Sequence, residues 1–455
     1  MNGQHSARYN GPSAGRSDRN RVARRVPTKS RERLRILVAA HCHPEISKGG
    51  AEIAAHQLFS QFRERSDCEA WFIACDRTRE VDRAGVVLVQ PFSEHEYIYT
   101  GGEFDWFKFS NPDHNFPEEF SRLLEELKPD IVHFHHFVNF GVEVFLNVRR
   151  TLPHCKIFLT LHEYLAICHH YGQMVTNRDR HLCYESKPIS CQRCFPEFSR
   201  SDFFLRKLYI GRFFDLIDGF IAPSRFLATR YVAWGLPPEK MHVIENVVRT
   251  SRKPPKQRAA ASDGVLRIGF FGQISALKGM DLVCDAAELL VENNLSDIVF
   301  EVFGDHRNQP PEFQTKLLER LKSARNLHFH GPYDSNHVDE LMQSVDAVLM
   351  ASIWWENSPV VIQEAFRNCR PVICPDIGGM AEKVRDGIDG VHFRAGSAVA
   401  LAKTLKRLAS DRRILKSLCE TIAVPPSPTE IIETHLSIYR TARAMPQSAR
   451  PEIAR

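Results

Sequence analysis

The stretch WWENSPVVIQEAFRNCRP, residues 354–371, holds two carboxylates, Glu356 and Glu364, with seven residues between them. If a helix begins between the two glutamates, Glu364 lies roughly 7–8 Å along the helix axis from its start. A sugar nucleotide has similar proportions, with sugar, diphosphate and ribose in a row. Glu356 would then accept hydrogen bonds from sugar hydroxyls, and Glu364 would accept from the ribose.

The residues between the two glutamates predict an anion site. Ser358 is a good helix N-cap and Pro359 suits the first helical position, so we expect the helix to begin at Pro359. The first free amides, at Val360 and Val361, would point out of the helix terminus and, with the helix dipole, hold a phosphate.

Two glutamates at this spacing often occur by chance, so neighbouring motifs decide the interpretation. The segment FFGQISALKG, residues 270–279, places Gly272, Gln273 and Lys278 between a predicted strand and a predicted helix. A second glycine turn lies in DIGGMAEKVRDGIDGVHF, residues 376–393, and a third in KGGAE, which contains Gly49 and Gly50. Such turns are typical of loops that hold phosphates.

These motifs need two sheets to position them. Apolar runs alternate with helical stretches from residue 34 to 250 and again from 265 to 424, which predicts βαβ units and parallel sheets. Residues 251–264, rich in Pro, charge and small side chains, predict a linker. A last helix within 425–444 is expected to cross back to the first domain, and 445–455 is a tail. We therefore expect an α/β protein of two doubly wound, Rossmann-like domains facing a cleft.

Composition bounds the class of protein. The formal net charge of the 455 residues is +5, and residues 1–33 hold nine Lys and Arg against one Asp and one Glu. We interpret 1–33 as a disordered basic leader without the apolar core of a signal peptide. No apolar run reaches transmembrane length. We expect a cytoplasmic protein with a peripheral contact to the inner face of the plasma membrane.

Taken in order, the motifs resemble those of the retaining GT-B glycosyltransferases of family 4, also called glycosyl transferases group 1. The resemblance covers residues 34–443 and is most specific in 268–393. It implies transfer of a sugar from a nucleotide donor to a glycan, lipid-linked or other glycoconjugate acceptor in bacterial surface polysaccharide synthesis.

The resemblance also implies site residues. His162, in LHE, matches the histidine that reaches the transferred sugar, and Lys278 matches the lysine that neutralises the diphosphate. Glu356 matches the sugar-contacting glutamate. The remaining matches lie around the donor phosphates and ribose: Gly49, Gly50, Gly272, Gln273, Ser358, Val360, Val361 and Glu364.

One position departs from the family pattern. The family usually has Arg where this chain has Gln273, which carries no charge and predicts weaker donor binding unless an arginine such as Arg225 compensates. No cofactor is expected for catalysis. Two other classes stay open: a nucleotide-sugar epimerase-like enzyme, and a non-catalytic protein that binds nucleotide or nucleic acid. A phosphorylase would need a pyridoxal-binding lysine, for which no motif is present.

Four of the twelve cysteines cluster after His162: Cys168, Cys183, Cys191 and Cys194. A C-x2-C pair with two further cysteines upstream, in a segment with little apolar content, is typical of a structural zinc site. Free or disulfide-forming thiols are the alternative. We expect Zn²⁺.

Two aromatic segments have less specific interpretations. Residues 97–116 combine aromatic and polar turn residues and predict an acceptor loop, or an ordinary loop packed on the core. Residues 203–217, apolar with interspersed Arg and Lys, are interpreted as a buried helix in preference to a membrane-surface helix.

Overall fold

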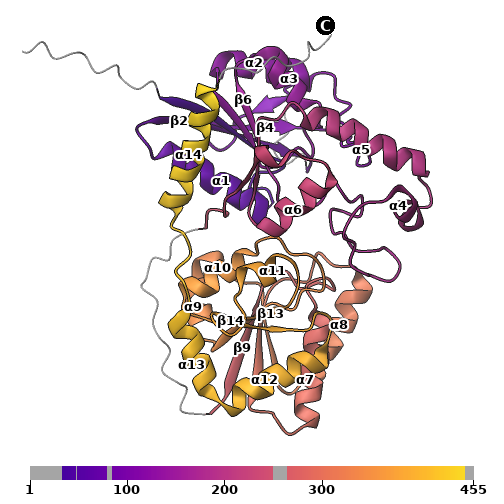
Figure 1. The fold of residues 1–455 in the computed structure, drawn as a ribbon, viewed down its shortest axis with the longest axis vertical. Coiled ribbons are helices and arrows are strands. Elements are labelled where there is room, and N and C mark those ends of the chain that lie inside the picture. The colour runs from indigo at the N-terminus through magenta and orange to yellow at the C-terminus, as the bar shows by residue number, and fades with distance from the viewer. Residues whose placement is uncertain (1–32, 48, 79–84, 249–263, 446–455) are drawn as a thin grey trace, which may run out of the picture. The chain divides into compact units, whose positions relative to one another are not determined.

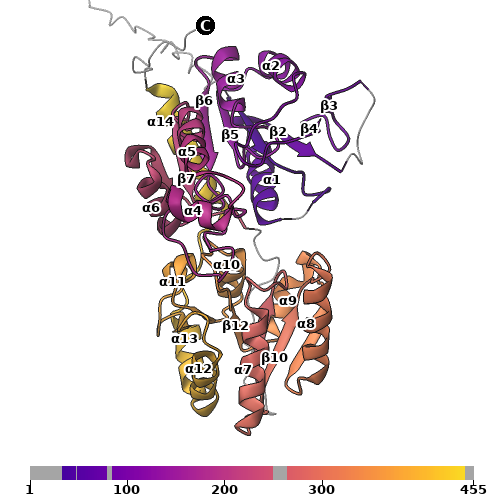
Figure 2. The ribbon, with the colours of Figure 1, turned by 90° about the vertical axis from the view of Figure 1, so that its right-hand side faces the viewer.

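The computed structural model describes residues 33–47, 49–78, 85–248 and 264–445. The basic leader lies outside the described residues except for its last residue, as does the linker except for Gly264, and so does the tail after Met445. The described chain contains two sheets that follow one another in the sequence, both within the unit Arg33–Arg455. Figures 1 and 2 show each sheet with helices on both of its faces.

The first sheet has the strand order β3-β4-β2-β1-β5-β6-β7-β8 and is parallel except for the antiparallel pair β3–β4. Its strands are β1 (Leu34–Ala40), β2 (Cys68–Asp76), β3 (Leu88–Val89), β4 (Glu96–Thr100), β5 (Ile131–Phe134), β6 (Lys156–Thr160), β7 (Gly219–Ala222) and β8 (Met241–Val243). The helices of this part are α1 (Gly50–Arg63), α2 (Phe116–Leu127), α3 (Val144–Thr151), α4 (Pro188–Cys194), α5 (Arg200–Phe214) and α6 (Arg225–Trp234), with the 3-10 turn η1 (Pro238–Lys240).

The second sheet is wholly parallel, in the order β11-β10-β9-β12-β13-β14. Its strands are β9 (Leu266–Phe271), β10 (Ile298–Phe303), β11 (Leu327–Gly331), β12 (Ala347–Leu349), β13 (Val372–Pro375) and β14 (Gly390–Phe393). Its helices are α7 (Met280–Glu292), α8 (Pro311–Ser323), α9 (Val338–Gln343), α10 (Val360–Arg367), α11 (Gly378–Lys383), α12 (Ala398–Ser410) and α13 (Arg412–Thr421), with the 3-10 turn η2 (Ser335–His337). The predicted α/β class with two Rossmann-like domains is confirmed.

Alternation along the strands divides the core of each sheet between two faces. In β1, Ile36 and Val38 pack with α1 and with the last helix, α14 (Pro428–Ala444), whereas Leu37 packs with α2, α3 and α5. In β9, Ile268 and Phe270 pack against α7 and α12. Because side chains alternate in a strand, one apolar run supplies both layers.

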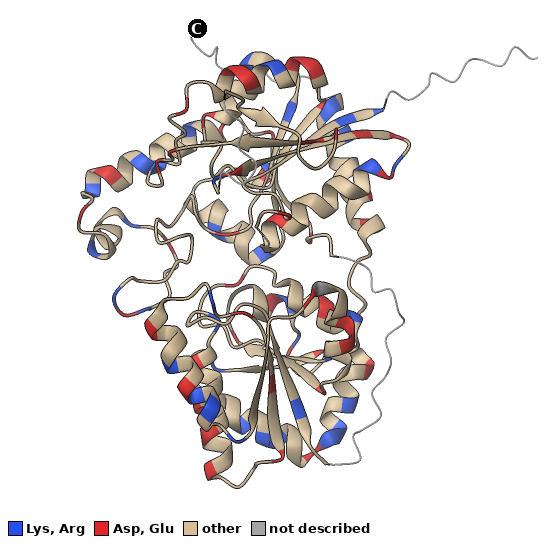
Figure 3. Cartoon of the chain, turned by 180° about the vertical axis from the view of Figure 1, so that it is seen from behind, with Lys and Arg blue, Asp and Glu red and all other residues tan. Residues whose placement is uncertain are grey.

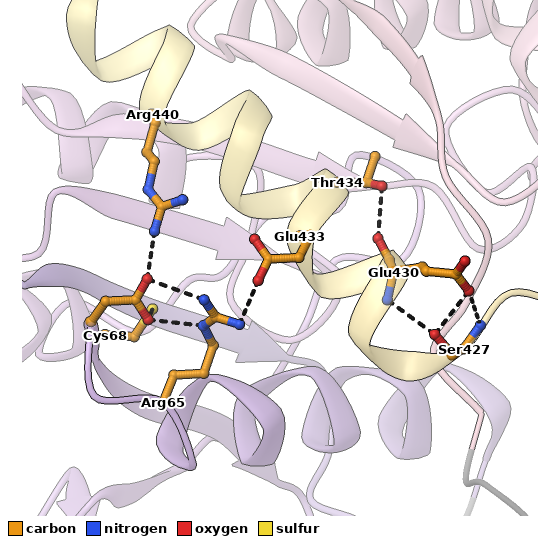
Figure 4. Close-up of polar contacts among 8 residues, drawn as sticks. Arg65, Cys68, Ser427, Glu430, Glu433, Thr434 and Arg440 are labelled. Atoms are coloured by element: carbon orange, nitrogen blue, oxygen red, sulfur yellow. Dashed lines mark hydrogen bonds and ion pairs between the residues drawn. The ribbon is translucent and has the colours of Figure 1, made fainter.

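The last helix belongs to the second part by sequence but packs on the first sheet. Two ion pairs join it to the end of α1 and the start of β2: Glu433 accepts from Arg65 at 2.7 Å, and Arg440 donates to Asp67 at 2.6 Å (Figure 4). Ser427 and Glu430 form a capping box at its start. The helix therefore returns the chain to the first sheet, next to α1.

Sequence reasoning missed the strands β4 and β8 and did not predict the exposed apolar face of α5. Residues 97–116 begin inside β4, and β8 was not predicted because its three residues are only partly apolar. Helix α5 is not a fully buried helix as interpreted: Phe203 and Ile210 are buried, but Phe204, Leu205 and Leu208 are 54%, 58% and 50% exposed. Within the described residues, no helix is both long and apolar enough to span a bilayer.

Candidate active site

The predicted site residues follow the strands at which the strand order of each sheet reverses. In the first sheet β1 lies between β2 and β5, and in the second β9 lies between β10 and β12. Parallel α/β sheets bind ligands at the carboxyl ends of such strands. The segments that follow β1, β5 and β6 in one sheet, and β9 and β12 in the other, line a single cavity of about 480 Å³.

Most predicted site residues line this cavity. They are His162, Gly50, Gly272, Gln273, Lys278, Glu356, Ser358, Val360 and Val361. Gly49 and Glu364 do not line it. Gly49 precedes α1 as its N-cap, where a Cβ would come within 2.4 Å of a Glu52 carboxylate oxygen. Arg225 is exposed at the start of α6 and does not line the cavity either, so it cannot compensate for Gln273 from this position.

Glu356 is the most heavily bonded carboxylate of the cavity. Its Oε1 accepts from Lys278 Nζ at 2.6 Å, from Ser352 Oγ at 2.7 Å and from Trp354 Nε1 at 2.9 Å. The side chain of Glu356 is 8% exposed and that of Lys278 is 29% exposed. A buried carboxylate needs such donors to remain charged. Sequence reasoning assigned these two residues to different parts of a ligand and missed their ion pair.

The helix after Glu356 begins one residue later than predicted. Helix α10 starts at Val360, its N-cap residue is Pro359, and no side chain caps it. The predicted N-cap Ser358 instead donates from Oγ to Glu245 Oε1 at 2.6 Å, so that prediction was wrong. Its physical reason is the charge-assisted bond to Glu245, 113 residues away in the sequence, which sets the orientation of the Ser358 side chain. Among the described residues, the amides of Val360 and Val361 have no acceptor.

Close packing of glycines holds this loop in place. A Cβ on Gly379 would lie 1.6 Å from the carbonyl oxygen of Asn357, and one on Gly279 would lie 1.9 Å from that of Ala351. The Gly379 amide also donates to the Glu356 carbonyl at 2.7 Å. The backbone around Glu356 is therefore fixed by contacts that only glycine allows.

Histidines and carboxylates dominate the side of the cavity formed by the first sheet. His162 Nε2 lies 3.0 Å from His135 Nδ1, and burial together with neighbouring imidazoles lowers the pKa of His162 to about 3. His162 is therefore neutral at pH 7. Two further pairs line the cavity: His41 with Glu52, and His136 with Glu163, each at 3.0 Å. The motif analysis missed both pairs, because histidine and glutamate without fixed spacing give no pattern.

Asn357 joins the two sides. Its Nδ2 donates to the backbone carbonyl of His162, 195 residues away. Its Oδ1 is buried and has no hydrogen-bond partner among the described residues, and the residue lines the cavity. An unpaired buried acceptor is costly unless a ligand donor satisfies it.

Positive charge is scarce in the lining of the cavity. Among the described residues that line it, Lys278 is the only lysine or arginine. Elsewhere both signs are interspersed along the helices of each part (Figure 3). Glu364, on α10, lies near Asp339 and Arg367; burial and the Asp339 charge raise the pKa of its carboxyl to about 7.

Two Rossmann-like parallel sheets with one cavity at their carboxyl edges define the class of protein, the GT-B fold. The chain belongs to the family 4, or group 1, glycosyltransferases: the family described as Glycosyltransferase Family 4 matches residues 48–252, and Glycosyl transferases group 1 matches residues 252–422.

Curated relatives are similar over part of the chain. A D-inositol 3-phosphate glycosyltransferase of Streptomyces bingchenggensis is 28% identical over 199 residues, which are 41% of this chain and 43% of that protein. An alpha-D-kanosaminyltransferase of Streptomyces kanamyceticus is 24% identical over 42% of this chain and 51% of its own. A Klebsiella pneumoniae protein named for the cps region is 22% identical over 59% of this chain and 63% of its own. The match thus spans about half the length of the first two relatives.

Solved structures share the fold over nearly the whole chain. Anabaena HepE in complex with UDP and glucose has a TM-score of 0.62 at 16% identity, covering 90% of this chain and 100% of its own. Sucrose-phosphate synthase of Thermosynechococcus elongatus has a TM-score of 0.64 at 14% identity, covering 90% and 98%.

Proposed function

We propose that this chain is a retaining glycosyltransferase that moves a sugar from a nucleoside-diphosphate donor to a hydroxyl of a glycan, lipid-linked or other glycoconjugate acceptor. The observation that carries the proposal is the meeting, in one cavity, of Lys278, Glu356 and the free amides at the start of α10. The membership of family 4 and the likeness to HepE, whose structure contains UDP and glucose, support the donor class.

The diphosphate would lie at the amino end of α10. There the amides of Val360 and Val361 donate to phosphate oxygens, and the ammonium of Lys278 supplies positive charge. Donor binding requires Lys278 to share its bond with Glu356 or exchange it for phosphate. The leaving group gains negative charge as the anomeric bond breaks, so these donors stabilise the transition state more than the ground state.

The transferred sugar would lie between the two sides of the cavity. Glu356, whose bonds within the protein all reach Oε1, accepts from a sugar hydroxyl at Oε2. Asn357 Oδ1 accepts from a second hydroxyl. Neutral His162 donates or accepts a hydrogen bond beside the reacting carbon. The ribose would extend along α10 toward Glu364.

The reaction would proceed on one face of the sugar. The bond from the anomeric carbon to the diphosphate oxygen breaks, the acceptor oxygen attacks the same face, and the acceptor proton passes to the leaving phosphate oxygen. No step needs a protein nucleophile. The chain's own residues bind and orient donor and acceptor and neutralise the developing charge.

The acceptor would be presented at a membrane surface that contains anionic lipid, which fits a role in surface polysaccharide synthesis. Helix α5 supplies the contact: exposed Phe204, Leu205 and Leu208 share one face, flanked by exposed Lys207 and Arg212. Apolar side chains flanked by cations match the boundary between acyl chains and anionic headgroups. The enzyme would then work at the cytoplasmic face of the plasma membrane.

Vesicle sedimentation tests that contact. Wild type should sediment with vesicles containing anionic lipid and release them at high salt, and the double change Phe204→Ser and Leu205→Ser should lose binding. Val399→Ser, an equally exposed apolar residue on α12, serves as the control. Equal sedimentation of all three proteins would remove α5 from the proposal.

Incubation with a panel of nucleotide sugars tests the central activity. Mass spectrometry should detect slow hydrolysis of one donor to nucleoside diphosphate and free sugar, and NMR of the first-formed sugar should show the donor's anomeric configuration. Glu356→Gln should turn over the donor far more slowly. A product of unchanged mass with altered stereochemistry would indicate an epimerase instead, and salt-sensitive binding of nucleic acid without any turnover would overturn the transferase proposal.

A further inference from the structure

The four clustered cysteines come together at one place in the fold. Cys168, Cys183, Cys191 and Cys194 line a small cavity of about 50 Å³ beside α4, and none forms a disulfide. Between β6 and α5 the chain has little regular structure: one seven-residue helix, α4, and an isolated bridge from Val175 to Leu182. Backbone bonds such as Thr176 to His181 and Cys183 to Met174, both at 2.8 Å, form local turns here and no sheet.

A buried cation lies beside these thiols without a carboxylate partner. Arg206 is 4% exposed, and its guanidinium donates to the carbonyls of Phe107, Ala166 and Leu165 at 2.7–2.8 Å. Among the described residues it forms no ion pair. The thiols of Cys168 and Cys191 lie close enough to interact with its charge. A buried charge without a counterion is expensive, so thiolates here would offset the charge of Arg206.

The surroundings of the four thiols are largely apolar. Cys168 packs against the core of the first sheet, and Ile167, Met174 and Phe195 line the same small cavity. In such surroundings a thiolate needs a cation beside it.

We propose that Cys168, Cys183, Cys191 and Cys194 bind one Zn²⁺ as four thiolates, and that Arg206 offsets one of the two negative charges of the resulting complex. Binding releases four protons, one from each thiol, and involves no change of oxidation state. Zinc bound by four sulfurs at about 2.3 Å places those sulfurs closer together than they lie in this structure, where no three of them fall within 4.8 Å of one another. Metal binding would therefore tighten the segment.

Another cluster competes for a metal. The ligand atoms of His43, His56 and Glu96 lie within 4.8 Å of one another, the single such group among the described residues. However, the Glu45 amide donates to His43 Nδ1, so the ring proton resides on Nε2, which donates to Glu96 at 2.8 Å. A neutral imidazole cannot keep that proton and bind metal through the same nitrogen. The ring nitrogens of His43 and His56 are instead hydrogen-bonded to Glu96.

The cysteine segment, residues 163–199, contacts the loop of residues 350–359, called the donor loop here, a name that rests on the proposed function. Trp355 precedes Glu356, its Nε1 donates to the Cys183 carbonyl at 2.8 Å, and its ring lies 5.1 Å from that of Tyr184. Arg206 holds the carbonyls of Leu165 and Ala166, three and four residues after His162. Zinc would thus position the segment that packs against Trp355.

Elemental analysis of the full chain, purified without a metal-affinity tag, tests the proposal. We expect about one zinc per chain in wild type, in the control Cys419→Ser on α13, and in His56→Gln. Cys191→Ser and Cys194→Ser should lose most of it. If these variants do not fold, chelation of wild-type protein replaces them. Removal of zinc should expose four additional titratable thiols, and these thiols should become protected again when zinc is returned.

Each alternative result overturns the assignment. These results are absence of zinc with four reactive thiols in a stable protein, a disulfide among the four cysteines found by mass spectrometry, or zinc that disappears in His56→Gln. Binding of nucleoside diphosphate is measured in parallel. Loss of that binding in zinc-replete protein would count against the proposed function, whereas loss of zinc alone counts against this site.

Discussion

The donor loop and the cysteine segment both follow a parallel strand and both reach the same cavity, yet different forces order them. The donor loop, residues 350–359 between β12 and α10, is held by backbone bonds, such as Met350 to Ile373 at 2.9 Å and Ile353 to Leu277 at 2.9 Å, and by Gly279 and Gly379 in close contact with it. The backbone bonds of the cysteine segment, residues 163–199, such as Cys183 to Met174 at 2.8 Å, join residues within the segment or at the start of α5. The donor loop is therefore tied by its backbone to distant parts of the chain, whereas the cysteine segment reaches them through side chains such as Arg206 and Trp355.

The largest effect should come from breaking the carboxylate of the donor loop. Glu356→Gln removes the charge that pairs with Lys278 and an acceptor for the sugar, so we expect transfer to fall by about 100–1,000-fold. Nucleoside diphosphate should bind at least as well, because Lys278 is released. Turnover and calorimetry on the same preparation measure both quantities.

The exposed surface glutamate Glu319, on α8, supplies the matched control, Glu319→Gln. An equal loss of nucleotide binding and transfer in Glu356→Gln would show that the residue serves the phosphates and not the sugar.

A glycine change should break the donor loop through its backbone. In Gly379→Ala the new Cβ meets the Asn357 carbonyl, so the loop must shift, and we expect a loss of stability of about 1–3 kcal/mol together with weaker nucleotide binding. Zinc content should stay unchanged. Gly211→Ala, in open space on α5, is the control, and chemical denaturation measures both. A Gly379→Ala protein with wild-type stability would show that the loop is not fixed in this way.

Adding a positive charge at position 273 should raise the affinity for nucleoside diphosphate. Lys278 is the only lysine or arginine among the described cavity residues, so Gln273→Arg should tighten nucleoside diphosphate by roughly threefold to tenfold. Calorimetry at two salt concentrations should show a gain that shrinks as salt rises. Unchanged affinity at low salt would mean that the added guanidinium does not reach the phosphates.

The smallest effect concerns pH. Burial raises the pKa of Glu364 to about 7, so the carboxyl is largely protonated at pH 6 and ionised at pH 8. If Glu364 accepts from ribose hydroxyls, nucleotide affinity should rise by a few fold across that window, and Glu364→Gln should remove the Glu364 contribution. The phosphate of the ligand also titrates there, so the difference between the two proteins is the measured quantity.

The contribution of Glu364 to the stability of the fold should fall with pH, opposite to its contribution to nucleotide affinity. A carboxyl whose folded pKa lies above its unfolded value favours the fold fully below about pH 4.5 and loses that contribution as pH rises through 7. The melting temperature of Glu364→Gln should therefore rise relative to that of wild type between pH 5 and 8. A constant difference across this range would show that Glu364 has an ordinary pKa.

Local patterns predicted the fold because they record local physics. Apolar alternation and glycine turns located β1, β9 and most helices. The same patterns missed β4, whose tyrosines suggested a loop. Short edge strands such as β8 lack the apolar run that marks a buried strand.

Partners distant in sequence could not be predicted. Ser358 bonds to Glu245, Asn357 bonds to His162, and Lys278 pairs with Glu356 over separations of 113, 195 and 78 residues. Single-sequence reasoning identifies which residues have suitable chemistry, but the tertiary fold decides which of them satisfy one another. The corrected N-cap at Ser358 is the clearest example.

Titration of nucleoside diphosphates into the full chain tests the central claim, that Lys278 and the start of α10 form the diphosphate site. We predict that at least one diphosphate binds wild type, that Lys278→Met weakens it by about tenfold or more, and that Arg225→Met, outside the cavity, leaves it unchanged. Binding that is indifferent to Lys278→Met but lost in Arg225→Met would contradict the account.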